Sequence, residues 1–237
     1  MPLILRVDVD KPYGRSNMLQ KVLSKTREDL WFPAINMIGY LSTSEALLDY
    51  CNQNDIRGIF YFRNCTSPNS KIKGLMAKGN HAFGFHAENT RTTETFQSEL
   101  SSMKKSVPNG MLHSFTKHGS GKLKLGKNHY PPYEPEKYKE WVQTMGVPFY
   151  FGNEVVEEMD DFSPVDGFYP KMFWLKKEYR IESFATIEDV ISAAKTETVP
   201  IIIHPANFVA DTFVNSELKR LVDLSKENNI DWITEMS

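Results

Sequence analysis

Two aspartates separated by one valine end the first apolar run of the chain, in the segment "RVDVDKP" at residues 6–12. An ionised carboxylate is costly to bury without a partner, so Asp8 and Asp10 either end a solvent-facing strand or hold a ligand. In a regular strand, side chains two residues apart point to the same face. One carboxylate could therefore bind a divalent metal while the other orients or deprotonates a water on that metal.

Histidines accompany these acids at other predicted strand ends. Two of them directly follow apolar runs, namely His86 after "HAFGF" and His204 after "VPIII". Aspartate and histidine at one rim suit either a metal with an activated water or metal-free acid–base catalysis. Their coincidence on separate strands favours a functional site over isolated structural residues. Four of the six histidines lie on or just after such ends: His86, His118, His129 and His204.

The elements that must position these residues alternate between short apolar runs and segments of helical period. Strands are predicted at 3–10, 57–64, 81–89, 111–119, 147–154, 166–175, 199–208 and 230–236. Helices are predicted at 43–53, 70–79, 92–106, 135–146, 186–197 and 215–229.

This order predicts a single α/β domain over residues 1–237, built as a distorted parallel barrel of about seven βα units. The run "IIIH" is apolar without alternation, as in a sheet that is covered on both faces. A doubly wound open sheet is the alternative architecture. No glycine-rich nucleotide fingerprint follows the first strand, which does not favour the doubly wound sheet. In either architecture the site lies at the carboxyl ends of the strands.

Composition narrows the class of partner. The net charge of −2 gives no electrostatic case for binding nucleic acid or an anionic membrane. The two cysteines, Cys51 and Cys65, form no CxxC pair, so they indicate neither a zinc cluster nor a redox motif. The first residues do not resemble a signal peptide, and no apolar stretch approaches the length of a membrane span. We therefore expect a cytoplasmic protein without a membrane span.

Taken in order, these motifs resemble those of the polysaccharide deacetylases, the NodB-homology or carbohydrate esterase family 4 group. "VDVD" resembles the aspartate motif, which implies Asp8 as catalytic base and Asp10 as metal ligand. "HAENT" resembles the first part of a His-x-x-x-His motif and implies His86 as a ligand, but Thr90 occupies the second histidine position. "IIIHP" resembles the last motif and implies His204 as catalytic acid.

The resemblance implies a distorted parallel barrel and metal-dependent removal of acetyl groups from an N-acetylated sugar or polysaccharide precursor. The implied cofactor is a divalent metal, zinc in the first place, with cobalt, nickel or manganese as alternatives. Because Thr90 replaces a histidine, the third ligand is predicted to be His118 or Glu88. If neither completes the site, the chain is a non-catalytic carbohydrate-binding relative. A hydrolase of another small C–N bond substrate is the remaining alternative.

The predicted substrate is a carbohydrate or a nucleotide sugar. "YPPYEP" at 130–135 resembles the Pro-aromatic core of a further family motif, with Tyr130 in place of its arginine. Aromatic side chains such as Trp174 could stack on sugar rings. The residues predicted to bind substrate are Lys117, His129, Tyr130, Tyr133 and Asn207.

Overall fold

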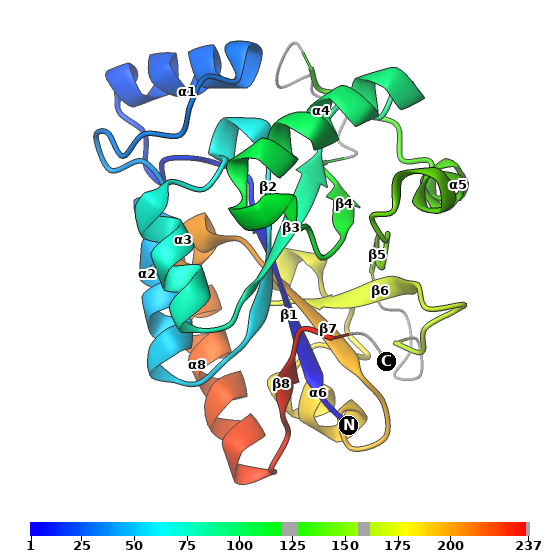
Figure 1. The fold of residues 1–237 in the computed structure, drawn as a ribbon. Coiled ribbons are helices and arrows are strands. Elements are labelled where there is room, and N and C mark those ends of the chain that lie inside the picture. Colours follow the sequence, from blue (N-terminus) through cyan, green and yellow to red (C-terminus); the bar gives the residue numbers. More distant parts are fainter. Residues whose placement is uncertain (120–127, 156–161, 236–237) are drawn as a thin grey trace.

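A computed structural model describes residues 1–119, 128–155 and 162–235 of the chain. Within these residues the strands form one parallel sheet in the order β4-β3-β2-β1-β7-β6-β5, and β8 pairs with β1 beside that path (Figure 1). The strands are β1 (Leu3–Val9), β2 (Gly58–Phe62), β3 (Ala82–Ala87), β4 (Phe115–Lys117), β5 (Phe151–Val155), β6 (Tyr169–Trp174), β7 (Val199–Ile203) and β8 (Trp232–Ile233).

The two ends of this sheet meet, so the sheet is a nearly closed barrel. Phe115 in β4 forms a parallel bridge with Phe149, two residues before β5, and its N–H donates to the carbonyl of Pro148 at 2.8 Å. The predicted parallel α/β barrel is therefore confirmed, and the doubly wound open sheet is not found.

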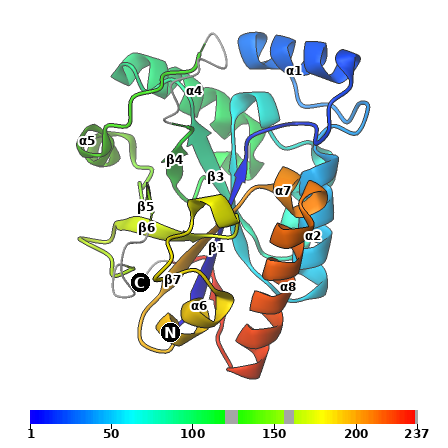
Figure 2. The same cartoon turned by 180° about the vertical axis from the view of Figure 1, so that it is seen from behind.

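Helices cover the outside of the barrel. In Figures 1 and 2, α2, α3 and α8 stand along one side and α4 and α5 lie on the other. α1 lies at the end of the barrel where the carboxyl ends of β1 to β4 gather. The helices are α1 (Met18–Leu30), α2 (Ser42–Gln53), α3 (Ser70–Lys78), α4 (Thr93–Ser106), α5 (Pro135–Met145), α6 (Ile187–Ala193), α7 (Pro205–Ala210) and α8 (Thr212–Glu227).

Strand β1 shows how the barrel divides its side chains. Leu3, Leu5, Val7 and Val9 pack into the large core under the helices, because alternate residues of a strand face opposite sides. Ile4 instead joins a smaller apolar cluster with residues of the neighbouring strands. That cluster contains Ile4, Ile59, Tyr61, Phe151, Tyr169, Met172 and Ile202.

Above this apolar layer the interior of the barrel becomes polar. Arg6 is 1% exposed, and its guanidinium lies 5.8 Å from the ring centre of Tyr61. It donates to both carboxylate oxygens of Asp8, at 2.9 and 2.7 Å, and to the carbonyl of Gly152 at 2.9 Å. The pair compensates two charges that would be costly to bury alone.

Two helices depart from the predicted elements. Residues 18–30 form α1, where the sequence analysis predicts no helix. Its apolar side chains Met18, Leu19 and Val22 face solvent rather than the core. The strand predicted at 199–208 ends at Ile203, and α7 begins at Pro205, where proline suits the first turn of a helix. His204 is therefore the residue between strand and helix.

Candidate active site and metal centre

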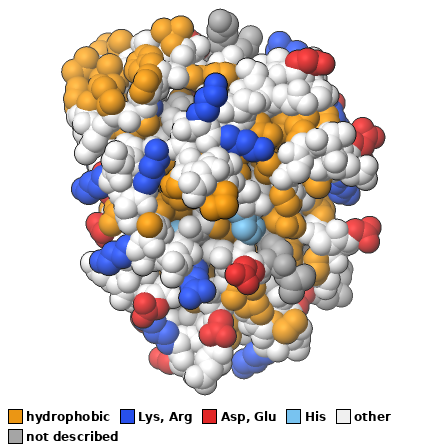
Figure 3. Space-filling view, in the orientation of Figure 1, with side chains coloured by type: hydrophobic (Ala, Val, Ile, Leu, Met, Phe, Trp, Pro, Cys, Tyr) orange, Lys and Arg blue, Asp and Glu red, His pale blue; other side chains and the backbone are white. Residues whose placement is uncertain are grey.

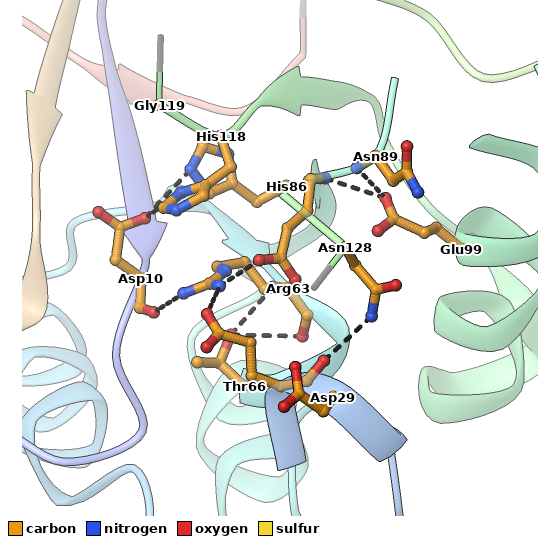
Figure 4. A network of polar contacts seen from close by, with 12 residues as sticks. Asp10, Asp29, Arg63, Thr66, His86, Asn89, Glu99, His118, Gly119 and Asn128 are labelled. Carbon is orange, nitrogen blue, oxygen red and sulfur yellow. Dashed lines mark hydrogen bonds and ion pairs between the residues drawn. The ribbon is translucent and has the colours of Figure 1, made fainter. Parts of the chain in front are cut away.

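Asp10 contacts three imidazole rings at the carboxyl ends of the strands, and Figure 4 shows it beside His86 and His118. Its Oδ1 atom is 3.1 Å from Nε2 of His86 and 3.1 Å from Nδ1 of His118. Its Oδ2 atom is 3.1 Å from Nε2 of His204. Three strand ends, those of β3, β4 and β7, thus bring histidines to one carboxylate that follows β1.

One ligand atom each from Asp10, His86 and His118 lies within 4.8 Å of the other two. A carboxylate and two imidazoles form a common ligand set for zinc and related divalent ions, and a catalytic site leaves a further position open. The residues that are present therefore fit a divalent metal. His118, one of the two residues predicted as third ligand, belongs to this group, whereas Glu88 pairs with Arg63.

The protonation of these groups suits metal binding. Burial, together with the charge of Arg63, lowers the pKa of His118 to about 4, so its imidazole is neutral at pH 7. Burial opposes ionisation of Asp10, but His118 and His204 outweigh it and hold the pKa of the Asp10 carboxyl well below its usual range. Metal ligands must be deprotonated, and both groups meet that condition.

A hydrogen bond orients His86. Its Nδ1 lies 2.7 Å from the hydroxyl of Thr116 in β4, which leaves Nε2 facing Asp10. Partners of this kind fix the tautomer of a metal-binding histidine. Thr116 was not anticipated from the sequence, because its contact depends on the pairing of β3 with β4 in register His86–Thr116.

Thr90, at the position where the family motif carries its second histidine, lies away from this cluster. Its hydroxyl is 3.1 Å from the hydroxyl of Tyr138 in α5, and the residue is fully buried. The histidine that reaches Asp10 instead is His118, which directly follows β4, the next strand along the chain.

Arg63, which follows β2, joins the cluster to α1 and β3. It donates to the backbone carbonyl of Asp10 at 2.5 Å, to Glu28 of α1 at 2.6 Å, and to Glu88. The Oε2 atom of Glu99 in α4 accepts the N–H of Glu88 at 2.9 Å. Burial and the charge of Glu88 raise the pKa of Glu99 to about 8. This network fixes the backbone on both sides of the imidazole cluster (Figure 4).

A cavity of about 540 Å³ opens above the cluster. Trp174 forms one wall, and its ring stacks on His204 with ring centres 6.0 Å apart. The lining is Asp8, Asp10, Lys11, His86, Lys117, His118, Gly119, Trp174, Lys176, Tyr179, His204, Pro205, Ala206 and Asn207.

The residues predicted to bind substrate fall into two groups. Lys117 and Asn207 line the cavity, and burial lowers the pKa of Lys117 to about 8. His129, Tyr130 and Tyr133 are not part of the lining formed by the described residues. The ring of His129 packs edge-on against His118, with ring centres 5.5 Å apart. Tyr130 binds the end of β3 through its backbone N–H, and Tyr133 packs against Tyr138 in α5.

Comparisons with known proteins agree on the fold. No protein-family model and no curated protein matches the sequence. The probable polysaccharide deacetylase from Pseudomonas aeruginosa PAO1 is similar in structure, with a TM-score of 0.51 at 11% identity over 98% of this chain and 88% of that one. The chain therefore has the fold of the polysaccharide deacetylases, and that part of the resemblance is confirmed.

Two further structures match at lower scores. A family 4 acetyl xylan esterase from Clostridium thermocellum in complex with a cobalt ion has a TM-score of 0.48 at 12% identity, over 98% of this chain and 87% of that one. The catalytic domain of a peptidoglycan N-acetylglucosamine deacetylase from Eubacterium rectale ATCC 33656 has a TM-score of 0.46 at 12% identity, over 99% and 90%. Within the described residues, no helix is long and apolar enough to cross a membrane.

Proposed function

We propose that the chain is a metal-dependent hydrolase that removes acetyl groups from an N-acetylated sugar or polysaccharide precursor. The observation that carries this proposal is the convergence of Asp10, His86 and His118 on one point in the floor of a cavity. Asp8 and His204 line the same cavity, so a candidate base and a candidate acid lie beside the ligand cluster.

In this proposal Asp10, His86 and His118 hold the divalent ion, which we expect to be zinc. A divalent ion supplies Lewis acidity toward the acetyl carbonyl and lowers the pKa of a water. The protein holds its ligands in place through Thr116, which contacts His86, and Arg63, which binds the backbone of Asp10.

Asp8 is the proposed base. Its Oδ2 atom lies 3.7 Å from Nε2 of His86, so the carboxylate is beside the ligand cluster. Burial opposes its ionisation, but Arg6, together with His86 and His204, outweighs burial and lowers the pKa of Asp8. The carboxylate is therefore ionised at pH 7 and can accept the proton of an attacking water.

His204 is the proposed acid. Burial disfavours its protonated form, but Asp10 and Asp8 outweigh burial and raise the pKa of His204. A protonated imidazole on this wall of the cavity can donate to the amine nitrogen as it leaves. Trp174, stacked on the ring, restricts the orientation of His204.

The proposal is tested by measuring two quantities on the purified chain. Metal content after purification without chelators should approach one divalent ion per chain, and acetate should be released from N-acetylated sugars in a zinc- or cobalt-dependent manner. Sugar binding without metal and without acetate release would instead identify the non-catalytic carbohydrate-binding relative. Release of a product other than acetate from a small amide would identify a different C–N hydrolase.

A further inference from the structure

A second cavity of about 440 Å³ adjoins the first, and Ala206 of α7 lines both. It lies between the loop after β1, α1, the start of α2 and α7. Arg15 is the one charged residue among the described residues that line it, and no carboxylate takes part. The polar lining also includes Gln20, Ser42 and Thr43.

The start of α2 offers unused hydrogen-bond donors to this cavity. Its N-cap residue is Leu41, which has no side-chain acceptor for the N–H groups of the first turn. The N–H of Ser42 donates to the carbonyl of Gly39, and that of Glu45 donates to the carbonyl of Leu41. Among the described residues, no acceptor is found for the N–H groups of Thr43 and Ser44 between them; Thr43 lines the cavity, whereas Ser44 is fully buried behind it. Such free N–H groups, at the positive end of the helix dipole, favour an anion.

A buried hydroxyl at the same place is an independent indication of a ligand. Thr43 is 5% exposed and lines the cavity, yet its Oγ1 atom has no hydrogen-bond partner among the described residues. Buried polar side chains nearly always have a partner, so an unpaired hydroxyl in a cavity wall calls for one from outside the chain.

The charges around the cavity agree with an anionic ligand. The nearest acid along α2 is Glu45, whose carboxylate forms an ion pair with Lys71 at 2.8 Å and does not line the cavity. Arg15 is exposed, and its guanidinium can form paired hydrogen bonds with phosphate oxygens.

We propose that the second cavity binds a phosphate group through Arg15, Thr43 and the first turn of α2. This inference rests on the proposed function and names its substrate class, a sugar phosphate or sugar diphosphate. Because Ala206 lines both cavities, the acetylated sugar ring can occupy the first while its phosphate occupies the second.

Binding is tested with glucose 1-phosphate, which carries no acetyl group and so cannot be deacetylated. Isothermal titration calorimetry on the zinc-loaded full chain should detect glucose 1-phosphate and not methyl glucoside. Arg15→Gln should weaken binding by about tenfold or more, as expected for charge-assisted hydrogen bonds. Thr43→Val, which keeps the shape of the side chain, should weaken it by about threefold to tenfold.

Arg57→Gln is the matched control, because Arg57 is an exposed arginine just before β2 that does not line the cavity. It should bind glucose 1-phosphate like the unmodified chain. Equal affinity in all four proteins, or no binding in any of them, would overturn the proposal. If Thr43→Val fails to fold, the Arg15→Gln variant still tests the proposal, because Arg15 is exposed and its substitution should not disturb folding.

Turnover separates this inference from the proposed function. Arg15→Gln should raise KM for N-acetylglucosamine 1-phosphate about tenfold and leave kcat/KM for methyl N-acetylglucosaminide unchanged. Arg15-dependent binding of glucose 1-phosphate without acetate release from either compound would keep the phosphate site and reject the deacetylase. Acetate release that is independent of Arg15 for both compounds would keep the deacetylase and reject the phosphate site.

The source of the phosphate is distinguished by two substrates. UDP-N-acetylglucosamine represents nucleotide sugars, and a prenyl-diphosphate N-acetylglucosamine in detergent micelles represents lipid-linked sugars. Arg15-dependent turnover of either supports the site and identifies the source, whereas turnover of both that ignores Arg15 contradicts it.

Discussion

Asp8 and Asp10 are two residues apart, yet they have different partners. The carboxylate of Asp8 is bound by Arg6 from inside the barrel, whereas the carboxylate of Asp10 contacts only imidazole nitrogens among the ion pairs of the described residues. This difference supports unlike roles, because an aspartate held by an arginine is less available to a metal ion than one whose contacts are imidazole nitrogens.

We expect Asp10→Ala and Asp8→Asn to separate these roles. Asp10→Ala should lose both metal and acetate release, because it removes the one carboxylate of the proposed ligand set. Asp8→Asn should retain metal but lose turnover, since an amide cannot accept the proton. Metal analysis of the purified variants and an acetate assay check both; activity in both variants would show that the assignment is wrong.

Asp8→Asn should also destabilise the fold. It leaves the Arg6 charge buried without its carboxylate, and breaking such a pair costs roughly 3–5 kcal/mol. The double variant Arg6→Met/Asp8→Asn should recover part of this loss, because it removes the unpaired charge. Urea denaturation of the three proteins measures the effect, and a double variant less stable than Asp8→Asn would contradict the explanation.

His118→Ala should abolish metal binding, while Thr90→Ala should not. His118 supplies one of the three clustered ligand atoms, whereas the Thr90 hydroxyl contacts Tyr138. Thr90→Ala should cost only about 1 kcal/mol of stability from its lost hydrogen bond. Metal titration of the two variants checks the contrast. Metal loss in Thr90→Ala but not in His118→Ala would contradict the proposal that His118 is the ligand.

Strand-end positions predict that Asp10, His86 and His204 lie close together, and both imidazoles are 3.1 Å from the Asp10 carboxylate. The sequence does not decide between His118 and Glu88, because the choice depends on which side chain turns toward Asp10 and which toward Arg63. The ion pair of Arg6 with Asp8 is predictable in principle, since Ile4, Arg6 and Asp8 alternate along β1 and therefore point to one face. The contacts of Arg63 could not be read, because they join segments up to 53 residues apart.

At the scale of elements, Arg63 connects β1, β3 and α1 around the ligand cluster. Arg63→Met should lower metal affinity by about tenfold to a hundredfold, as losses of the residues that orient metal ligands commonly do. Arg91→Met is a suitable control, because Arg91 is exposed and packs on Tyr130. Metal competition titrations on folded protein, verified by circular dichroism, give the comparison; equal affinities would mean that the network has no influence on the site.

Two helices, α1 and α7, were not predicted from the sequence, and the reasons differ. α1 exposes Met18, Leu19, Val22 and Leu30, and hydrophobic side chains gather at the upper left of the surface in Figure 3, over this helix. Met18, Leu19, Val22 and Leu23 nevertheless recur at helical spacing, so this helix is readable from the sequence, and the prediction of a linker there is wrong. α7 has six residues, too few for a periodic signal.

The stability of the whole molecule should depend on pH through His81. This residue is 7% exposed, its Nδ1 accepts the N–H of Gly58 at 3.2 Å, and its Nε2 lies 3.0 Å from Oδ1 of Asn52. It thereby joins the starts of β2 and β3 to α2. Burial lowers its pKa from 6.5 to about 4, so between these values the unfolded chain binds a proton that the folded chain does not.

The free energy of unfolding should therefore fall as the pH drops from 6.5 toward 4, by up to about 1.4 kcal/mol per pH unit from this group. At pH above 6.5 the contribution of His81 is fully present. His81→Gln removes the titration, so the stability difference between the two proteins should shrink on acidification. Denaturation series at pH 7.5, 6 and 5 check this; parallel curves for both proteins would rule out His81 as the cause.

Metal binding at the ligand cluster should also restrict the local motion of the short strand β4. β4 has three residues, pairs with β3 and touches the β5 side through one bridge at Phe115, yet it is followed directly by His118. An ion held by Asp10, His86 and His118 would act as a cross-link between three separate chain segments. Amide hydrogen exchange in residues 115–118 should then slow on metal addition far more than exchange in β7, which has β1 and β6 on its two sides.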